Sequence, residues 1–156
     1  MLFRSILATE MGTDGNLTHL LNIPGGGSAC PITESNVNDH LVTLAMQGKE
    51  VFKHAVNRMK EAAETVIRRA GLEAGDIACV IPHQANLRII DAIAERLEVP
   101  DGRVFVNLDK YGNTSAAAVA IALDEASRSG AFKRGDHIVM VVFGAGLTWA
   151  AAAVRW

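Results

Sequence analysis

Cysteine, aromatic residues and long apolar runs are all scarce in this sequence. Two cysteines in 156 residues are too few for the disulfide framework of a small secreted protein, which favours a reducing, cytoplasmic setting. Aromatic residues make up 5% of the chain. The net charge is −2, so no excess of basic residues points to a nucleic-acid partner. The longest apolar runs, 116–123 and 138–143, are far too short to span a membrane, and no membrane partner is expected.

Hydrophobic residues are plentiful and follow alternating helix and strand patterns. They make up 49% of the chain, enough for the core of one domain or of half a larger enzyme. Apolar residues at i, i+3 and i+4 predict helices within 41–70, 84–97 and 113–129. Strands are predicted over 2–8, 77–81, 103–108, 138–142 and 147–155, with a turn-rich surface excursion over 10–40. This alternation predicts a layered α/β fold.

Three short segments with polar groups or glycines follow predicted strands. His83 comes directly after the strand that Pro82 ends, Asn113 follows the next strand, and Ala145 lies between two glycines that join the last two strands. In open α/β sheets, ligands and catalytic groups gather at such strand ends. An imidazole, a carboxamide and a backbone amide together suit the chemistry of a thioester carbonyl. Taken singly, each has a plainer interpretation: a loop histidine, a helix N-cap and an ordinary hairpin turn.

Neither cysteine has the surroundings of an activated nucleophile. Cys79 lies within an apolar strand and is predicted to be a buried core thiol, whereas Cys30 follows a glycine-rich loop. A nucleophilic thiolate needs a helix N-terminus or a positive neighbour, and the sequence supplies neither signal. The other histidines lack the spacing of a zinc site, so no metal is expected.

The motifs around the three segments identify a family. They are IPHQANLR over 81–88, GNTSAA over 112–117 and FGAGLTW over 143–149. In type, order and spacing they resemble the C-terminal half of β-ketoacyl-[acyl-carrier-protein] synthase III, the condensing enzyme that initiates bacterial fatty-acid synthesis. The resemblance implies that 1–156 is a single thiolase-like domain with a mixed five-stranded sheet and flanking helices. It also implies that an N-terminal half, outside this sequence, carries the nucleophilic cysteine.

The resemblance assigns catalytic roles to three residues. The family is an acyltransferase that joins an acyl-CoA starter to malonyl-acyl-carrier protein, releasing carbon dioxide and CoA, with no cofactor beyond these thioesters. His83 and Asn113 match the family's catalytic histidine and asparagine, which stabilise the enolate formed on decarboxylation. Ala145 lies in the matching glycine-rich turn, whose backbone amide contributes to an oxyanion hole, although many members have glycine at this position.

The resemblance also implies a set of binding residues. Those that match the lining of the pantetheine tunnel are Met46, Gly48, Phe52, Ala85, Asn86 and Ile89. Lys53 and Arg88 match basic positions near the tunnel mouth, where they would attract the phosphates of CoA or the acidic carrier protein. In plainer terms, Met46 and Phe52 fit the apolar stripe of a helix, and Lys53 fits its solvated face.

Three functions remain open from the sequence. The first is the C-terminal catalytic domain of a synthase III, expected to act as a cytoplasmic homodimer once complete. The second is a related synthase that makes polyketide or other β-keto products. The third is a non-catalytic thiolase-fold partner of a cysteine-bearing chain. Half of a pseudo-symmetric fold is expected to expose an apolar face, which would indicate such a partner.

Overall fold

A mixed four-stranded sheet forms the centre of the structure, a computed structural model that describes residues 5–156. The strands lie in the order β1, β6, β5, β4, and their bounds are Ser5–Thr13 (β1), Ile77–Pro82 (β4), His137–Gly144 (β5) and Thr148–Arg155 (β6). The β4 and β5 strands are parallel, whereas β6 is antiparallel to both of its neighbours. A separate pair joins β2 (Leu21–Asn22) to β3 (Ala45–Met46).

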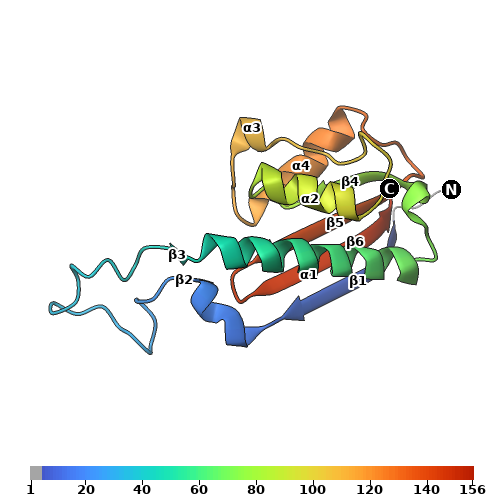
Figure 1. Cartoon of the computed structure of the whole chain (residues 1–156). Helices are drawn as coiled ribbons and strands as arrows, with labels where there is room; N and C mark the ends of the chain where they lie inside the picture. The colour runs from blue at the N-terminus through green and yellow to red at the C-terminus, as the bar shows by residue number, and fades with distance from the viewer. Residues whose placement is uncertain (1–4) are drawn as a thin grey trace.

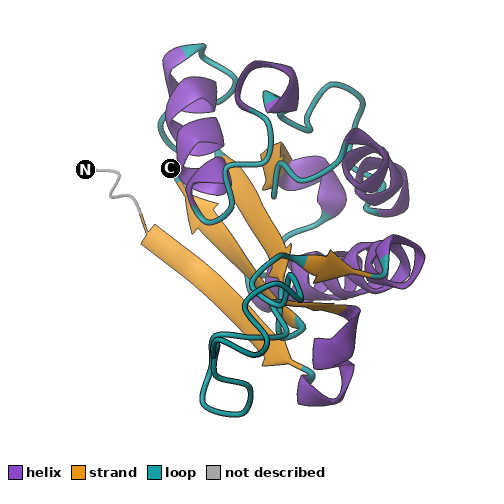
Figure 2. Cartoon of the chain, turned by 90° about the vertical axis from the view of Figure 1, so that its left-hand side faces the viewer, coloured by secondary structure: helices purple, strands orange, loops and turns teal. Residues whose placement is uncertain are grey.

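Helices cover the sheet on both faces (Figure 2). They are α1 (Gly48–Arg69), α2 (Leu87–Arg96), α3 (Leu108–Tyr111) and α4 (Ala117–Arg128), with 3-10 turns at Gly15–Leu20 and Ala74–Asp76. The long α1 helix runs across the sheet (Figure 1) and buries Met59 and Val66 against Val139 of β5. On the other face, Cys79 of β4 packs against Ala122 of α4. Neighbouring residues of each strand thus serve different cores, as strand geometry requires.

The apolar stripe predicted within 41–70 produces α1. Its buried residues include Val51, Ala55, Met59, Ala62 and Val66, which recur at three- and four-residue intervals. Gly71, with a φ of +68°, lies directly after the C-cap, where a left-handed residue commonly ends a helix. None of the helices within residues 5–156 is long and apolar enough to cross a membrane.

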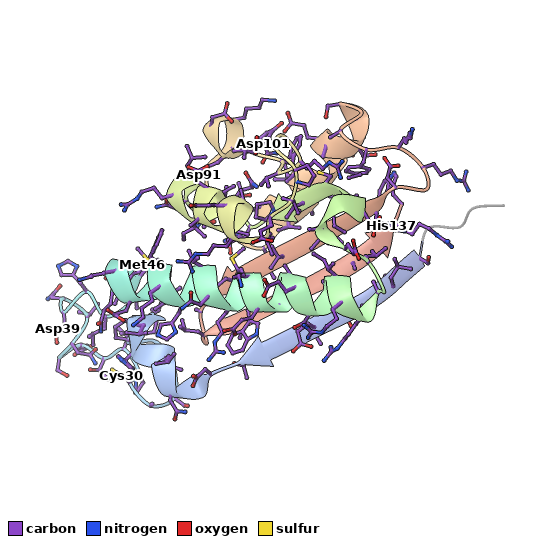
Figure 3. The ribbon with its side chains drawn as sticks, turned by 45° about the vertical axis from the view of Figure 1, so that its right-hand side comes forward. Cys30, Asp39, Met46, Asp91, Asp101 and His137 are labelled. Carbon is purple, nitrogen blue, oxygen red and sulfur yellow. The ribbon has the colours of Figure 1, made fainter. Side chains whose placement is uncertain are left out.

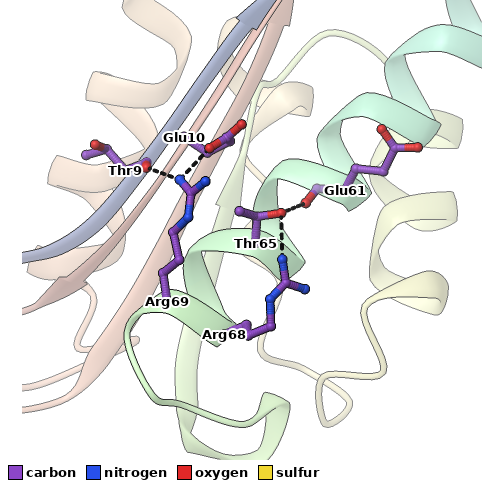
Figure 4. A network of polar contacts seen from close by, with 6 residues as sticks. All are labelled: Thr9, Glu10, Glu61, Thr65, Arg68 and Arg69. Carbon is purple, nitrogen blue, oxygen red and sulfur yellow. Dashed lines mark hydrogen bonds and ion pairs between the residues drawn. The ribbon is translucent and has the colours of Figure 1, made fainter.

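A polar cluster ties the end of α1 to the edge strand β1 (Figure 4). The Arg69 guanidinium donates to the backbone carbonyl of Thr9 at 3.1 Å and forms an ion pair with Glu10. One turn earlier, the Thr65 hydroxyl donates to the carbonyl of Glu61 at 2.7 Å. The two Arg69 contacts hold β1 against the helix that also packs on β5 and β6.

The strand predicted over 103–108 is reduced to a single bridge between Val104 and Val80, so the sheet has four strands rather than the five expected. The pairing stops because the Asn107 amide donates to a side chain, that of Gln84, and α3 begins at Leu108. The third helix begins at Ala117 instead of 113, because Gly112 and Ser115 have φ values of +65° and +56°.

The predicted excursion over 10–40 begins later than expected, because β1 continues to Thr13. Residues 23–44 contain no helix or strand and extend from the body at the left of Figure 1. The first strand was predicted over 2–8, of which 2–4 lie outside the described residues.

Candidate functional site

A cavity of about 890 Å³ opens at the carboxyl ends of β4 and β5. Because these strands are parallel, the segments that follow them meet at one edge of the sheet. His83 after β4, Asn113 before α4 and Ala145 after β5 all line this cavity. The structure therefore brings together the three groups that the sequence predicted at separate strand ends.

Most of the predicted binding residues line the same cavity. They are Met46, Gly48, Phe52, Ala85, Asn86, Arg88 and Ile89. Lys53 is exposed on α1 and does not line it. The basic residue of α1 that does line the cavity is Lys49, which lies one helical turn earlier.

His83 is held by the backbone at the exit of β4. Its N–H donates to the carbonyl of Val141 on β5 at 2.8 Å, and its own carbonyl accepts from the Ala85 N–H at 3.0 Å. Burial lowers the pKa of the His83 imidazole below its ordinary value of 6.5. The neutral ring therefore predominates at neutral pH and offers one N–H donor and one acceptor nitrogen.

Asn113 is oriented by a hydrogen bond within its own loop. Its side-chain oxygen accepts from the backbone N–H of Ser115 at 3.0 Å. With the oxygen engaged, the NH2 group is the end of the carboxamide that can donate to a ligand. Asn113 does not cap the following helix, because the N-cap of α4 is Ala116. The N-cap interpretation is therefore wrong, and the loop turns on the left-handed Ser115 instead.

The turn around Ala145 joins β5 to β6 as an antiparallel hairpin, in which Gly144 pairs with Thr148. The Thr148 hydroxyl donates to the Ala145 carbonyl at 2.9 Å and closes the turn. Ala145 itself is exposed and borders the cavity. The hairpin interpretation is thus correct, and the turn also lies where a backbone amide can face a bound ligand.

The α1 and α2 helices form one wall and the rim of the cavity. The Arg88 guanidinium lies over the Phe52 ring, 5.6 Å from its centroid, within the range of a cation–π contact. Asn86 caps α2, since its side chain accepts from the Arg88 N–H at 2.9 Å. Arg88 is exposed, so its charge is available to a ligand that enters from this rim.

Comparison with known proteins decides the family. Residues 67–156, more than half of the chain, match the family described as 3-Oxoacyl-[acyl-carrier-protein (ACP)] synthase III C terminal. The chain belongs to this family. Its likeness to the C-terminal half of synthase III, inferred from three motifs, is confirmed, and so is the layered α/β fold.

Relatives of the synthase III family match nearly the whole chain. The beta-ketoacyl-[acyl-carrier-protein] synthase III of Caldanaerobacter subterraneus subsp. tengcongensis is 52% identical over 151 residues, which are 97% of this chain and 46% of that protein. The crystal structure of the Aquifex aeolicus VF5 3-oxoacyl-[acyl-carrier-protein] synthase III superposes with a TM-score of 0.85 at 44% identity. That match covers 98% of this chain and 45% of the other. The chain thus spans about half the length of the relatives it matches.

A polyketide enzyme is also similar. The priming β-ketosynthase of the R1128 polyketide pathway superposes with a TM-score of 0.78 at 42% identity. The match covers 94% of this chain and 43% of that structure. The chain is therefore similar to a β-ketosynthase of polyketide biosynthesis as well as to synthase III enzymes.

Several cavity residues were missed from the sequence. They are Leu21, Leu44, Lys49, Val51, Ala55, Met59, Ser115, Phe143 and Gly144. Val51, Ala55 and Met59 fit the stripe of a core helix, and no periodicity marks which end of such a stripe faces a cavity. Leu21 and Leu44 flank the excursion, which only the pairing of β2 with β3 brings to the site. Lys49 could have been predicted from the sequence, because it lies four residues before Lys53 and therefore on the same face of the helix.

Neither cysteine lines the cavity. Cys79 is 2% exposed, and burial raises the pKa of its thiol to about 11, so it stays protonated at neutral pH. The prediction of a buried core thiol is confirmed. Cys30 lies in the excursion, toward the same end of the molecule as Met46 (Figure 3). Within residues 5–156, no cluster of three or more His, Cys, Asp or Glu side chains could hold a metal ion.

Proposed function

We propose that this chain supplies the C-terminal catalytic domain of a β-ketoacyl-[acyl-carrier-protein] synthase III, an acyltransferase of fatty-acid biosynthesis. The observation that supports the proposal is the convergence of His83, Asn113 and the Ala145 turn on one cavity at the ends of β4 and β5. Neither thiol of this chain faces the cavity, so the nucleophilic cysteine is proposed to come from a separate, cysteine-bearing half.

The proposed reaction condenses an acyl group on that cysteine with a malonyl thioester. Loss of carbon dioxide from the malonyl group leaves its bonding electron pair as an enolate, with negative charge on the thioester oxygen. An N–H of neutral His83 and the NH2 group of Asn113 donate to this oxygen and stabilise the charge as it forms. The enolate carbon then attacks the acyl carbonyl, and the cysteine thiolate leaves. During that attack the Ala145 N–H donates to the tetrahedral oxyanion.

The low pKa of His83 suits this role. A cationic imidazole would hold a proton on both nitrogens and would favour protonation of the enolate, which ends the condensation. Burial disfavours that cation. The site therefore presents hydrogen-bond donors to the oxygen without an acidic proton close to the reacting carbon.

The proposed substrates are acyl-CoA and malonyl-acyl-carrier protein. Their shared pantetheine arm is long and alternates hydrocarbon groups with two amides, and the cavity wall offers Met46, Phe52 and Ile89 to its hydrocarbon groups. Arg88 and Lys49 at the rim supply positive charge for the phosphate that ends the arm and for an acidic carrier surface. Lys53 lies further along α1, where it would meet the carrier rather than the arm. The proposed chemistry uses these thioesters and no cofactor.

The cysteine-bearing half is proposed to cover an apolar surface that the chain leaves open. On β1, Ile6 is 71% exposed and Met11 is 79% exposed, whereas Ala8 packs toward α1. The α4 helix adds exposed Ala117 and Ala120, whose small side chains allow a second helix to approach closely. An open apolar surface of this kind marks a missing partner. The complete assembly is proposed to be a cytoplasmic homodimer of such paired halves.

Two other functions are distinguished by one experiment. The similarity to the R1128 priming β-ketosynthase favours a polyketide-type synthase as the second candidate. The lack of a cysteine at the cavity favours a non-catalytic partner as the third. The chain is mixed with the cysteine-bearing N-terminal half of a synthase III, sized by gel filtration with intact mass, and assayed with acetyl-CoA and malonyl-carrier protein. Formation of 3-oxobutanoyl-carrier protein supports the proposal.

The remaining outcomes of that assay separate the alternatives. Condensation that requires a different starter thioester supports the related synthase. Co-elution of the two halves without condensation of any starter supports the non-catalytic partner. Failure of the halves to associate contradicts a role in which this chain completes the site of another.

A further inference from the structure

A buried glutamine lies directly beside the histidine of the site. Gln84 is 1% exposed, and its three side-chain hydrogen bonds are all to backbone groups. Its NH2 group donates to the carbonyl of Pro82 at 2.9 Å and to the carbonyl of Phe105 at 3.2 Å. Its oxygen accepts from the N–H of Asn107 at 3.0 Å. The side chain thus has a partner for both of its hydrogens and for its oxygen.

These bonds continue the hydrogen-bond ladder between β4 and the segment around Val104, beyond the point where backbone pairing stops. The Val80 N–H donates to the carbonyl of Arg103 at 2.7 Å, and the Phe105 N–H donates back to Val80 at 2.9 Å. Beyond this bridge the next groups that a neighbouring strand would pair are the carbonyl of Phe105 and the N–H of Asn107. The Gln84 carboxamide takes both, in the manner of a peptide group.

The bonds of Gln84 join the two loops that carry the polar groups of the site. One end of the connection is the exit of β4, where Pro82 precedes His83. The other is the segment 105–107, which leads through α3 to Asn113. The bridge of Val80 to Val104 joins the same two elements earlier along β4, and the Gln84 bonds extend that connection to the residues next to His83.

A second set of contacts fixes the far side of this segment. Asn107 is 2% exposed, and its side-chain NH2 donates to Glu125 of α4 at 2.8 Å. Glu125 also forms an ion pair with Lys110 of α3. The segment that Gln84 holds against β4 is therefore held against α4 as well, through a residue in the last turn of that helix.

We propose that Gln84 is a positioning residue that sets the separation between the His83 and Asn113 donors. The inference rests on the proposed function, because the two donors must reach one thioester oxygen for the separation to matter. Misplacing a catalytic group by 1 Å can cost about 100-fold in rate. Gln84 touches neither substrate nor reacting atom, so its effect passes through the two loops.

The test replaces Gln84 in the assembly of this chain with a cysteine-bearing half. Gln84→Met keeps the length and burial of the side chain and removes all three hydrogen bonds. We expect kcat for malonyl decarboxylation to fall at least tenfold, with KM within threefold of wild type. Acylation of the partner's cysteine should stay within twofold, because that step does not use the His83–Asn113 separation.

The matched control is Val66→Ala, a loss of side-chain volume in the buried stripe of α1, away from the cavity lining. We expect this variant to lower the melting temperature while both partial reactions stay within twofold of wild type. Hydrogen exchange gives an independent measure, since the Asn107 amide should lose protection in Gln84→Met and keep it in Val66→Ala.

Three results would overturn the inference. They are an unchanged decarboxylation kcat in Gln84→Met, an equal loss of both partial reactions, and full protection of the Asn107 amide in that variant. Should Gln84→Met not fold, Gln84→Asn keeps a carboxamide but shortens the side chain by one methylene, so that it no longer reaches Pro82, Phe105 and Asn107 together. We then expect a severalfold loss of decarboxylation with acylation intact, and no loss would refute the role. Failure of the proposed function looks different, because the wild-type assembly itself would then not decarboxylate malonyl thioesters.

Discussion

At the scale of single residues, the candidate site combines an imidazole and a carboxamide on loops that hydrogen bonds to the backbone hold in place. Partial burial lowers the pKa of the His83 imidazole and favours its neutral form, and the carboxamide of Asn113 is oriented by the Ser115 N–H. Preorganised donors of this kind require no rearrangement when charge develops on a substrate oxygen. Their contributions can be separated, since each side chain can be removed alone.

Replacing the histidine should remove one reaction step and spare another. We expect His83→Ala to lower malonyl decarboxylation in the assembly by about 100-fold or more, the usual cost of losing an oxyanion donor. Acylation of the partner's cysteine should remain largely intact. The two partial reactions are measured by carbon dioxide release and by intact mass. His54→Ala, a change on α1 outside the cavity lining, is the control, and equal loss of both steps in His83→Ala would contradict the assigned role.

The pH dependence should follow from the lowered pKa of His83. Decarboxylation requires the neutral ring, so its rate should fall as the pH drops through the folded-state pKa, which lies below 6.5. The same shift acts on stability, because the unfolded chain takes up a proton near pH 6.5 that the folded chain resists. Stability should therefore decline as the pH falls below 6.5, and His83→Ala should reduce that decline. An acid limb of the rate profile at or above 6.5 would contradict the prediction.

The charge of Arg88 should act on substrate encounter. We expect Arg88→Ala to raise KM for malonyl-carrier protein more than it lowers kcat, because charges at a rim affect association first. Steady-state kinetics at low and moderate salt provide the test, and the difference from wild type should shrink as salt rises. Arg68→Ala, a change near the far end of α1, is the control. An unchanged KM in Arg88→Ala would contradict a role for Arg88 in binding the carrier-linked substrate.

At the scale of elements, the sequence predicted what periodicity can report. The stripe of α1, the apolar run of β4 and the hairpin of β5 and β6 all lie where expected. The strand over 103–108 was wrong because its outer groups bond to the Gln84 side chain rather than to a strand. The start of the third helix was wrong because Ser115 takes a left-handed conformation that its residue type does not announce. Both exceptions lie beside the candidate site.

The left-handed residue should tolerate glycine and resist branching. At Ser115, with a φ of +56°, a left-handed conformation costs an ordinary side chain about 1–2 kcal/mol and a glycine much less. We expect Ser115→Gly to keep or slightly raise the free energy of unfolding. Ser115→Val should lower it by about 1–2 kcal/mol and reduce decarboxylation, because the N–H that orients Asn113 moves. Denaturant unfolding measures the first effect, and equal stability of the two variants would contradict the argument.

At the scale of the whole molecule, the open surface on β1 and α4 matters most. The motifs identified the family and implied a second half. They did not show which apolar residues form the open surface, because that depends on the register of β1 on β6. In that register Met11 lies opposite Ala150, while the bulge between Ile6 and Ala8 shifts the alternation of the strand. This local shift could not be read from the sequence.

A charge on this surface should weaken assembly. We expect Met11→Lys to reduce co-elution with the cysteine-bearing half at least tenfold, because the ammonium group would have to be buried without a partner. Leu87→Lys, at an exposed apolar position at the start of α2, should co-elute as wild type does. Gel filtration over a concentration series measures the change, and equal elution of the two variants would place the interface elsewhere.

The buried thiol of Cys79 also provides a way to measure how often the protein opens locally. An alkylating reagent reacts with a thiolate, and Cys79 is both enclosed beneath α4 and held protonated. Cys79 can therefore be alkylated only when β4 and α4 separate. In a mass spectrum, the rate at which a second alkyl group is added, after the one on Cys30, measures how often these two elements separate. Binding of the cysteine-bearing half over α4 should lower the alkylation rate of Cys79. A core residue with no part in catalysis would then report on assembly.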